Sequence, residues 1–396
     1  MPVALFCHAR LRDQSLLATG RRDMRIVFCI VVWLLVTGTP AHAELPAETI
    51  TTSTMQQPGP SWFIAKSGGL PYYIFDAATG QMQGQLALSY FTPTVQPNLA
   101  RGEIYAAESY YSRGVRGQRT DLLAIYDMQT LTPVAEVQIP PKYEPSFFPR
   151  HIGLLGNGRH LVIFNMTPGQ SVSIVDVESR SYRGEIATTG CSTIMPVQRD
   201  DFFLICGDGT IQMIRVDTTG EESLRKRSPA FFSLENDPVS DKPIRSANGW
   251  LLHSFENLVY EVTAADERIL ISEPWSLLDA QTAAQGWRIA SSQPLAYHRG
   301  HDLLYVLMRV GDVNTRDDPA TEIWVFHKSQ KRRLLRRTLD RRAIAVHVTE
   351  EEAPRLLLLD EDATVSVLDG LQLRKLDEIH EVGPLPSMLQ GFRIDD

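Results

Sequence analysis

The residues of this sequence that could carry out chemistry are few and scattered. His298 and His301 (YHRGH) have a spacing that could ligate a metal ion, but two histidines are too few for a site, so we expect a turn between two inner strands. Residues 350–352 (EEE) and 360–362 (DED) could be paired carboxylates or a calcium loop, yet solvated turns at strand ends explain them better. No nucleophile elbow, phosphate-binding loop, zinc-protease motif or dinucleotide fingerprint occurs. The sequence therefore predicts no catalytic residue and no metal site in this chain.

The N-terminal part of the sequence has the features of a secretory signal peptide. Residues 26–36 (IVFCIVVWLLV) form an apolar run that is too short for a membrane-spanning helix, which needs about 20 residues. Arginines precede this run, and an A-x-A site ending at Ala43 follows it. We expect residues 1–43 to be a signal peptide cleaved after Ala43, and translation from Met24 would make the preceding residues an upstream extension. The remaining chain, residues 44–396, has no run long enough to span a membrane, so we expect a soluble, exported protein.

Composition limits the class of protein. Hydrophobic residues make up 43% and charged residues 22%, which excludes a largely disordered chain or a collagen-like fibre. The net charge of -8 argues against a nucleic-acid partner, which would normally require a basic surplus.

Export also bears on the four cysteines. Cys7 and Cys29 lie in the predicted signal peptide, which leaves Cys191 and Cys206. Two apolar runs separate these cysteines, with a polar turn at residues 198–201 (QRDD) between the runs. Two antiparallel strands that fold back at this turn would bring the cysteines together, so an oxidising compartment predicts a Cys191–Cys206 disulfide. A metal site made by two cysteines alone is the less favoured alternative.

Two other segments have the composition of binding surfaces. Residues 108–121 (ESYYSRGVRGQRTD) interrupt a strand-like run with two tyrosines, glycines and arginines. Long loops of this kind usually carry recognition, so the segment could pack against a partner or line a channel. Residues 331–342 (KRRLLRRTLDRR) are the one basic cluster in an acidic chain. They fit an outer strand pair whose charges protect an exposed edge, with docking of an acidic protein as the alternative.

A repeated unit positions these segments. It consists of a run rich in β-branched or aromatic residues, a polar residue that is usually Asp, a few turn residues and a second run. The seven marker positions are Asp76, Asp127, Asp176, Asp217, Thr263, His327 and Asp369. Their mean spacing of about 49 residues is close to the length of a propeller blade. We interpret the Asp side chains as turn-formers that bind backbone amides, not as acid–base catalysts.

Each repeat predicts a four-stranded unit. Further apolar runs such as HLVIFNM and RLLLLD lie between the hairpins, as expected for strands buried on both faces. Two inner strands followed by an outer hairpin make a propeller blade. Residues 273–288 have helical character, with Ser276 as the expected N-cap. Residues 383–394 (GPLPSMLQGFRI) should provide the inner strand of the first blade and close the ring. The predicted fold is all-β: a seven-bladed β-propeller of four-stranded antiparallel blades.

Several of these segments resemble one known family. SRGVRGQRTDLLAIYD resembles the R-G-x-R-[ST]-D segment in the heavy subunit of the amine dehydrogenases that use tryptophan tryptophylquinone. The similarity continues in the same order through IPPKY, the GC-x(14)-CGDG segment around Cys191 and Cys206, EPWSLLDAQTAAQGW, YHRGHDLLYVLM and EIWVF. PWSLL and CGDG are closer to aromatic (aralkylamine) amine dehydrogenase than to methylamine dehydrogenase.

The resemblance implies the heavy subunit of a periplasmic quinoprotein amine dehydrogenase, an oxidoreductase that acts on CH–NH2 groups of primary amines and releases aldehyde and ammonia. It implies no cofactor in this chain, because tryptophan tryptophylquinone is made in a separate light subunit of an α2β2 heterotetramer. Electrons would then leave to a blue-copper protein. The resemblance also places Tyr111, with Tyr110 adjacent, in the substrate channel, and it matches Cys191 and Cys206 to the disulfide of the family. The methylamine enzymes have phenylalanine at the position of Tyr111, so the hydroxyl is a departure that bears on amine preference.

Two other functions stay open from the sequence. A standalone periplasmic propeller that binds a partner or acts as a scaffold would have the same fold and no catalytic activity. A single-chain propeller hydrolase or lactonase would need a metal cluster in its central channel. A neighbouring gene for a small, cysteine-rich exported chain would favour the amine dehydrogenase.

Overall fold

The computed structural model describes residues 54–67, 71–90, 95–143 and 150–392. The predicted signal peptide and its cleavage site lie outside these residues. Strands dominate the described part of the chain, and its helical structure consists of α2 (Ala280–Ala284) and a 3-10 turn, η1 (Val313–Thr315). No helix within the described ranges is long and apolar enough to cross a membrane.

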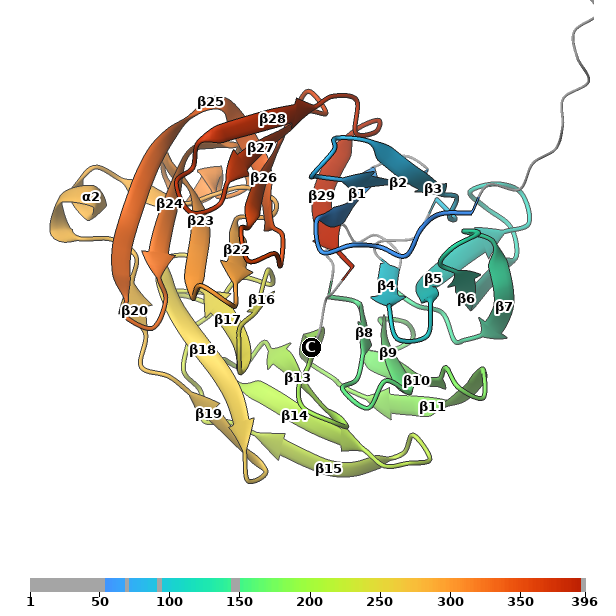
Figure 1. The fold of residues 1–396 in the computed structure, drawn as a ribbon. Helices are drawn as coiled ribbons and strands as arrows, with labels where there is room; N and C mark the ends of the chain where they lie inside the picture. The colour runs from blue at the N-terminus through green and yellow to red at the C-terminus, as the bar shows by residue number, and fades with distance from the viewer. Residues whose placement is uncertain (1–53, 68–70, 91–94, 144–149, 393–396) are drawn as a thin grey trace, which may run out of the picture. The chain divides into compact units, whose positions relative to one another are not determined.

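Every pairing between named strands is antiparallel, and the strands form six sheets arranged as a ring (Figure 1). The first three sheets are β29 (Pro386–Gly391), β1 (Trp62–Ser67), β2 (Tyr72–Asp76) and β3 (Met82–Leu86); β4 (Val95–Asn98), β5 (Glu103–Tyr111), β6 (Arg119–Asp127) and β7 (Pro133–Gln138); and β8 (Ile152–Leu154), β9 (His160–Asn165), β10 (Ser171–Asp176) and β11 (Ser181–Ala187). The fourth sheet is β12 (Cys191–Pro196), β13 (Asp201–Cys206), β14 (Ile211–Val216) and β15 (Glu222–Arg227). The fifth is β16 (Ile244–Arg245), β17 (Gly249–His253), β18 (Leu258–Ala265), β19 (Arg268–Ile271) and β20 (Trp275–Ser276).

The sixth sheet has eight strands. They are β21 (Trp287–Ile289), β22 (Leu295–His298), β23 (Leu303–Val310), β24 (Ala320–His327), β25 (Arg332–Val348), β26 (Arg355–Asp360), β27 (Val365–Asp369) and β28 (Lys375–Ile379). The prediction of seven separate four-stranded blades is therefore wrong. The structure is an all-β propeller with five blade-sized sheets, four of four strands and one of five, beside this continuous eight-stranded sheet.

The eight-stranded sheet exists because β25 is continuous over 17 residues. Its first part pairs with β24, where Arg336 lies opposite Trp324, and its last part pairs with β26, where Val346 lies opposite Leu358. The sequence has no Gly or Pro between residues 332 and 348 that would interrupt the strand. A repeat count based on hairpins does not reveal that a strand continues from one unit into the next.

The helix α2 is shorter than the predicted segment 273–288. Its N-cap is Asp279, whose carboxylate accepts a hydrogen bond from the backbone N–H of Thr282 at 2.8 Å. Ser276, the expected cap, lies in β20, which pairs with β18. The helix starts at Asp279 because Asp279 and Thr282 bond reciprocally in a capping box.

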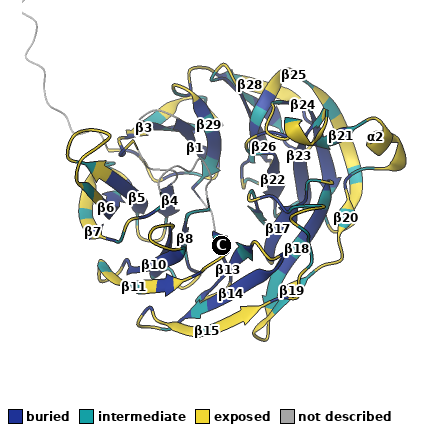
Figure 2. Ribbon diagram, turned by 180° about the vertical axis from the view of Figure 1, so that it is seen from behind, coloured by how far each residue is buried: buried dark blue, intermediate teal, exposed yellow. Residues whose placement is uncertain are grey.

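The core lies between neighbouring sheets. One cluster joins Phe164 of β9 and Ile174 of β10 to Phe202 of β13 and Ile214 of β14, and all four side chains are buried. Similar packing joins β23 and β24 to β25–β27 within the eight-stranded sheet. Figure 2 shows the burial of inner and middle strands and the exposure of outer strands such as β15.

The C-terminal segment closes the ring, which confirms the prediction for residues 383–394 as far as they are described. β29 pairs with β1, and Ile64 lies opposite Gln390. The first and last strands of the described chain therefore share one sheet, and the edge of β1 that faces the centre of the ring is paired by β29.

Successive connections in an antiparallel sheet alternate between two ends. We define the Asp-turn end by the connections at residues 77–81, 128–132, 177–180, 217–221 and 370–374, which follow the Asp markers. We define the long-loop end by the connections at residues 87–90, 112–118, 166–170, 207–210, 228–243, 311–319 and 380–385.

Candidate functional site

The tyrosine hairpin, formed by β5, β6 and the turn at residues 112–118, lies at the long-loop end. The two strands pair in regular register up to Tyr111, which lies opposite Arg119. The backbone N–H of Ser112 donates to Gln118 O at 2.9 Å and closes the turn. Gly117 has φ of +105°, a conformation that L side chains rarely adopt, so the turn requires glycine at this position.

One face of β5 carries a buried carboxylate. Glu108 is fully buried, and the hydroxyl of Tyr110 donates to it at 2.5 Å. The hydroxyl of Tyr126 and the backbone N–H of Ser89 donate at 3.1 and 3.0 Å. Burial raises the pKa of Glu108, and these three hydrogen bonds oppose the rise. The carboxylate thus holds the ring of Tyr110 against the sheet.

The opposite face of the same strand is fixed by a second network. The Ser109 hydroxyl donates to Asp121 at 2.7 Å, and Arg119 binds the same carboxylate through Nε at 2.7 Å and Nη2 at 2.8 Å. Arg119 also donates to the carbonyl of Lys142 at 2.6 Å. Since side chains alternate along a strand, this network supports the face that carries Tyr111.

The structure therefore places Tyr110 and Tyr111 on opposite faces of β5. Tyr110 is 45% exposed, and Tyr111 is partly exposed. Neither residue lines the cavity of about 220 Å³ at the centre of the ring. Their place in a substrate channel stays a prediction, since a channel shared with another subunit is not visible in one chain.

The sequence indicated Glu108 only as the start of the loop, and it did not reveal that Glu108 is a buried acceptor of three hydrogen bonds. Its partners are Tyr110, two residues later, and Ser89 and Tyr126, which lie far from it in sequence. The one local signal was the alternation of Glu108 and Tyr110, which puts both side chains on one face of a strand.

The predicted disulfide between Cys191 and Cys206 is confirmed. The two cysteines lie opposite each other in the register of β12 and β13, and the chain folds back between them at residues 197–200. This arrangement is the one expected from the polar turn in the sequence. The disulfide lies at the long-loop end of its sheet.

The two histidines of YHRGH have structural partners. Nε2 of His298 lies 2.9 Å from the carbonyl of Glu351, and Nε2 of His301 lies 2.7 Å from that of Glu352. The pair thus joins two neighbouring turns. No group of three potential metal ligands occurs among the residues that the structure describes.

The acidic segments differ from each other. Glu352 is exposed, as expected for a solvated turn, and Glu351 pairs with Arg355 at 2.5 Å. Asp360 is only 5% exposed and pairs with Arg341 at 2.8 Å, so the solvated-turn interpretation is wrong for Asp360. It lies at the end of β26, where a carboxylate excluded from water requires a cationic partner.

The basic cluster of β25 is largely neutralised within the chain. Arg336 pairs with Glu322 at 2.5 Å, and Arg333 pairs with Asp279 at 3.0 Å. The guanidinium carbon of Arg333 also lies 4.5 Å from the centre of the Trp324 ring. These contacts support the edge-protecting interpretation over docking of an acidic protein.

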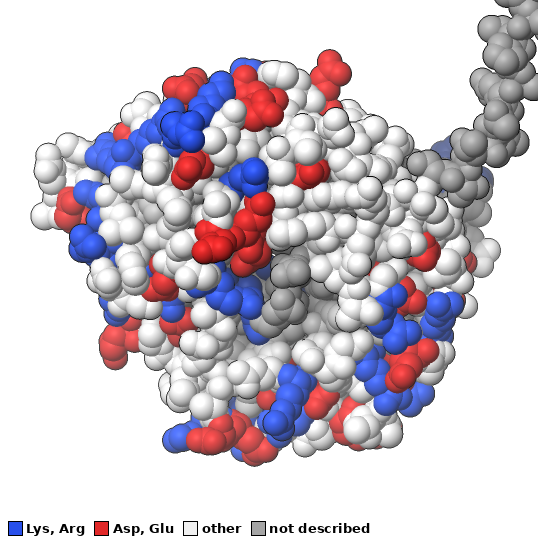
Figure 3. All heavy atoms as spheres, in the orientation of Figure 1, with Lys and Arg blue, Asp and Glu red and all other residues white. Residues whose placement is uncertain are grey.

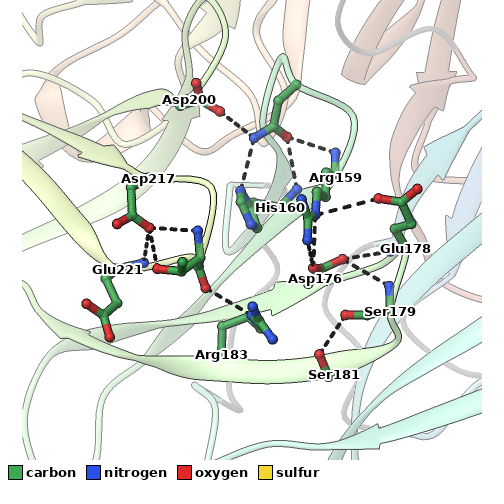
Figure 4. Close-up of polar contacts among 12 residues, drawn as sticks. Arg159, His160, Asp176, Glu178, Ser179, Ser181, Arg183, Asp200, Asp217 and Glu221 are labelled. Carbon is green, nitrogen blue, oxygen red and sulfur yellow. Dashed lines mark hydrogen bonds and ion pairs between the residues drawn. The ribbon is translucent and has the colours of Figure 1, made fainter.

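The Asp markers act as turn-formers, as predicted. Figure 4 shows Asp176, which accepts backbone N–H bonds from Glu178 and Ser179 at 3.0 Å each and two bonds from Arg159 at 2.9 and 2.6 Å. Burial opposes ionisation of this carboxylate, but the bonds from Arg159 and Ser179 outweigh it, and the pKa of Asp176 is lowered. Equivalent backbone bonds close the turns after Asp76, Asp127, Asp217 and Asp369.

Polar contacts also join neighbouring sheets at the Asp-turn end. Arg180 pairs with Glu103 of the preceding sheet at 3.2 Å, and Arg183 donates to the carbonyl of Thr219 in the following sheet at 2.9 Å. Figure 4 shows the second of these contacts as a dashed line between β11 and the turn after Asp217.

Exposed apolar side chains are more frequent in the connections of the long-loop end than in those of the Asp-turn end. Sixteen large apolar side chains are exposed in the described residues, and Leu371 is the one that lies in a connection of the Asp-turn end. Six lie in connections of the long-loop end: Tyr90, Val115, Met166, Leu234, Val313 and Leu385. Tyr110 and Val310 lie where strands end at the long-loop end, and the other seven lie on outer strands, where Met82, Val134, Tyr182 and Leu376 are the first or second residues after an Asp turn.

These features define a propeller with short, carboxylate-closed turns at one end and longer connections at the other. Residues 60–392 match the family model described as methylamine dehydrogenase heavy chain, and the chain belongs to this family. The heavy chain from Methylophilus methylotrophus is 25% identical over 287 residues, which cover 72% of this chain and 70% of that protein. The heavy chain from Paracoccus versutus is 21% identical over 361 residues, which cover 90% and 83%.

Solved structures support the fold alone. A functionally unknown protein from Desulfotomaculum acetoxidans has a TM-score of 0.55 at 8% identity, covering 83% of this chain and 98% of that chain. The dihydro-heme d1 dehydrogenase NirN in complex with DHE has a TM-score of 0.53 at 14% identity, covering 89% and 78%.

Proposed function

We propose that this chain is the heavy subunit of a periplasmic quinoprotein amine dehydrogenase that oxidises primary amines, with aralkylamines preferred. Membership of the heavy-chain family supports the subunit role. The observation that carries the proposal further is the accumulation of exposed apolar side chains at the long-loop end, where the tyrosine hairpin also lies.

The partner at this end is a light subunit, in an α2β2 assembly. Tyr90, Tyr110 and Val115 are 65%, 45% and 72% exposed around the hairpin, and burying them against a partner would be favourable. Aromatic residues are also enriched at the centres of protein interfaces. The tyrosine hairpin would then form one wall of a channel whose other walls belong to the light subunit.

The cofactor belongs to the light subunit in this proposal, and the tryptophans of this chain fit a structural role. Trp250 and Trp324 are fully buried in core clusters, and their indole N–H groups donate to Pro196 O and Glu322 at 2.7 Å each. Tryptophan tryptophylquinone, when bound in the partner, would accept electrons from the amine and pass them to a blue-copper protein.

The residues of this chain orient and enclose rather than react. Glu108 fixes the ring of Tyr110 through a 2.5 Å hydrogen bond, and Ser109, Asp121 and Arg119 brace the strand that carries Tyr111. Because contacts on both faces hold this strand in place, the channel beside it would keep a fixed width. A channel of fixed width can discriminate between amines of different size.

Kinetics of the assembled enzyme test this proposal. Coexpression with the light subunit should give a complex with a quinone absorption band that oxidises amines, and mass spectrometry should show a mature N-terminus after Ala43. Tyr111→Ala should change the ratio of kcat/KM for benzylamine over methylamine by about tenfold, because the side chain narrows the channel.

Tyr182→Ala is the matched control, since Tyr182 is 37% exposed on outer strand β11. The channel role is refuted if Tyr111→Ala leaves the ratio unchanged. A complex that forms without oxidising any amine, or a chain that never binds a light subunit, would favour a standalone propeller that binds or scaffolds.

A further inference from the structure

A second cavity lies at the long-loop end, between the fifth and sixth sheets. Its volume is about 370 Å³, which is within the range of sites for small molecules, about 300–1,000 Å³. Connections 228–243 and 311–319 both contribute residues to its walls, and β17 and β21 contribute His253 and Arg288. The lining contains apolar side chains as well, among them Leu234, Phe255 and Val313.

The charged side chains of this cavity differ in whether they are paired. Figure 3 shows one face of the ring, where most Lys and Arg side chains lie beside Asp or Glu. In the cavity, Lys242 follows this pattern and pairs with Asp317 at 2.6 Å. Arg288 does not, because its Nε donates to Gly311 O at 3.1 Å and it forms no ion pair with a carboxylate among the described residues. Asp241 likewise forms no ion pair with a side chain in the described part of the chain.

Asp241 and Arg288 therefore present two opposite charges to one cavity without pairing with each other. Desolvation raises the pKa of Asp241, and the nearby charge of Lys242 opposes the rise. A cation beside Asp241 and an anion beside Arg288 would each compensate a charge that has no ionic partner. A single ligand that carries both charges can contact both side chains.

His253 provides a third polar group in the wall. It is 5% exposed, and its Nδ1 forms no hydrogen bond with any described residue. Burial lowers the pKa of His253 to about 3, so its ring is neutral at pH 7, with one nitrogen as donor and the other as acceptor. Buried polar atoms are rarely left without a hydrogen bond, and a bound ligand is one explanation for an exception. A ligand that has both donors and acceptors can bond to Nδ1 whichever nitrogen carries the proton.

The walls of the cavity are held in place before any ligand binds. Lys242 donates to the carbonyl of Ser291 at 3.1 Å as well as to Asp317, and so joins the two connections. Ser291 is fully buried and has φ of +107°, a conformation that L side chains rarely adopt. Its hydroxyl donates to Ala343 O at 2.8 Å and accepts from the N–H of Ala320 at 3.1 Å, which fixes this backbone. Strained backbone of this kind is concentrated at functional sites.

We propose that this cavity binds a free α-amino acid with a large apolar side chain, with its ammonium group beside Asp241 and its carboxylate beside Arg288. Leu234 and Val313, which are 53% and 40% exposed, would cover the apolar side chain. The site is separate from the tyrosine hairpin, and it depends neither on a light subunit nor on amine oxidation.

Calorimetric titration of the full mature chain with L-phenylalanine tests the site. Two analogues are titrated separately: 3-phenylpropanoate, which lacks the ammonium group, and 2-phenylethylamine, which lacks the carboxylate. We expect saturable 1:1 binding of L-phenylalanine and binding of each analogue that is weaker by about tenfold or more, because each analogue loses one charge-assisted contact. L-leucine is the second probe, and binding of leucine alone would assign an aliphatic amino acid. The proposal is overturned if neither amino acid binds, or if either analogue binds as tightly as L-phenylalanine.

Two variants separate the two contacts. Asp241→Asn should weaken binding of L-phenylalanine about tenfold and leave that of 3-phenylpropanoate unchanged, whereas Arg288→Gln should weaken L-phenylalanine and leave 2-phenylethylamine unchanged. Asp241 is exposed in a connection, so Asp241→Asn decides the matter if Arg288→Gln does not fold. Arg268→Gln is the control, because the Arg268 side chain is 71% exposed on β19. Unchanged binding of L-phenylalanine in both variants, or an equal loss in Arg268→Gln, would contradict the proposal.

Discussion

At the Asp-turn end the connections are short and closed by carboxylates, whereas at the long-loop end most are longer and several expose apolar side chains. Asp176 illustrates the first end with four hydrogen bonds to one buried carboxylate. Val115, which is 72% exposed at the tip of the tyrosine hairpin, illustrates the second. The contrast separates an end closed by polar turns from an end that exposes apolar side chains, where the proposed interface lies.

The largest effect should come from the disulfide, which constrains the long-loop end independently of any partner. Replacing Cys191 and Cys206 together with serine should lower the free energy of unfolding by about 3 kcal/mol, since the bridge closes a loop of about 15 residues. Urea denaturation measures this loss. The native chain under reducing conditions should match the double variant, and an unchanged midpoint in both would show that packing alone holds this end.

A smaller loss is expected for Asp176→Ala at the Asp-turn end. The side chain of Asp176 has no exposed surface, but that of Arg159 is 38% exposed, so the cost should be about 2–3 kcal/mol, below that of breaking a fully buried pair. Asp217→Ala is the control, because Asp217 closes an equivalent turn in solvent and should cost much less. Equal losses in urea denaturation would mean that the turn, not the buried pair, supplies the stability.

Tyr110→Phe should cost about 1 kcal/mol, because it removes one of three donors to buried Glu108. The pKa of Glu108 is raised in the folded state by burial, so its ionised form opposes folding as pH rises through that pKa. The hydrogen bond from Tyr110 favours the ionised form of Glu108. The loss of unfolding free energy in Tyr110→Phe, relative to the native chain, should therefore be larger at pH 8 than at pH 4. Denaturation at both pH values checks this, and an equal deficit would contradict it.

The carboxylates of the Asp-turn end should respond to acid in the opposite way. Hydrogen bonds from Thr130 lower the pKa of Asp127 in the folded state. Asp127 therefore stabilises the fold above its pKa in the unfolded chain, and this stabilisation is lost as pH falls through its pKa in the folded chain. Carbon-13 titration of side-chain carboxyls should therefore place Glu108 above its usual pKa and Asp127 below. A Glu108 that titrates at or below its usual pKa would remove the contrast between the ends.

The smallest effect on folding should come from Val115→Ser, with a change within about 0.5 kcal/mol in the isolated chain. The same substitution should weaken association with a light subunit several-fold, because Val115 belongs to the proposed interface. Val134→Ser on outer strand β7, where Val134 is 47% exposed, should leave association unchanged. Analytical ultracentrifugation distinguishes the two, and equal behaviour would place the interface elsewhere.

Features with local signals were predictable from the sequence. The Asp turns depend on a carboxylate two to four residues from the amides that it binds, and the Cys191–Cys206 bridge depends on one hairpin. The closing strand was predictable because residues 383–394 lacked an outer hairpin of their own.

Features that depend on distant packing were not predictable. The predicted number of separate sheets was wrong because β25 continues through the boundary between two repeats. The role of Glu108 depends on Ser89 and Tyr126, which only the folded sheet brings to it. The burial of Asp360 likewise depends on Arg341, from a different strand.

The pairing of β1 with β29 has a consequence for the order of assembly. All six residues of β1 are buried in the finished ring, yet its partner is synthesised after every other described strand. Until β29 emerges, β1 presents an unpaired apolar edge that could pair with another chain. A nascent chain of this protein thus needs protection from aggregation throughout its synthesis, and a chain cut before Pro386 should be found in inclusion bodies rather than in a smaller ring.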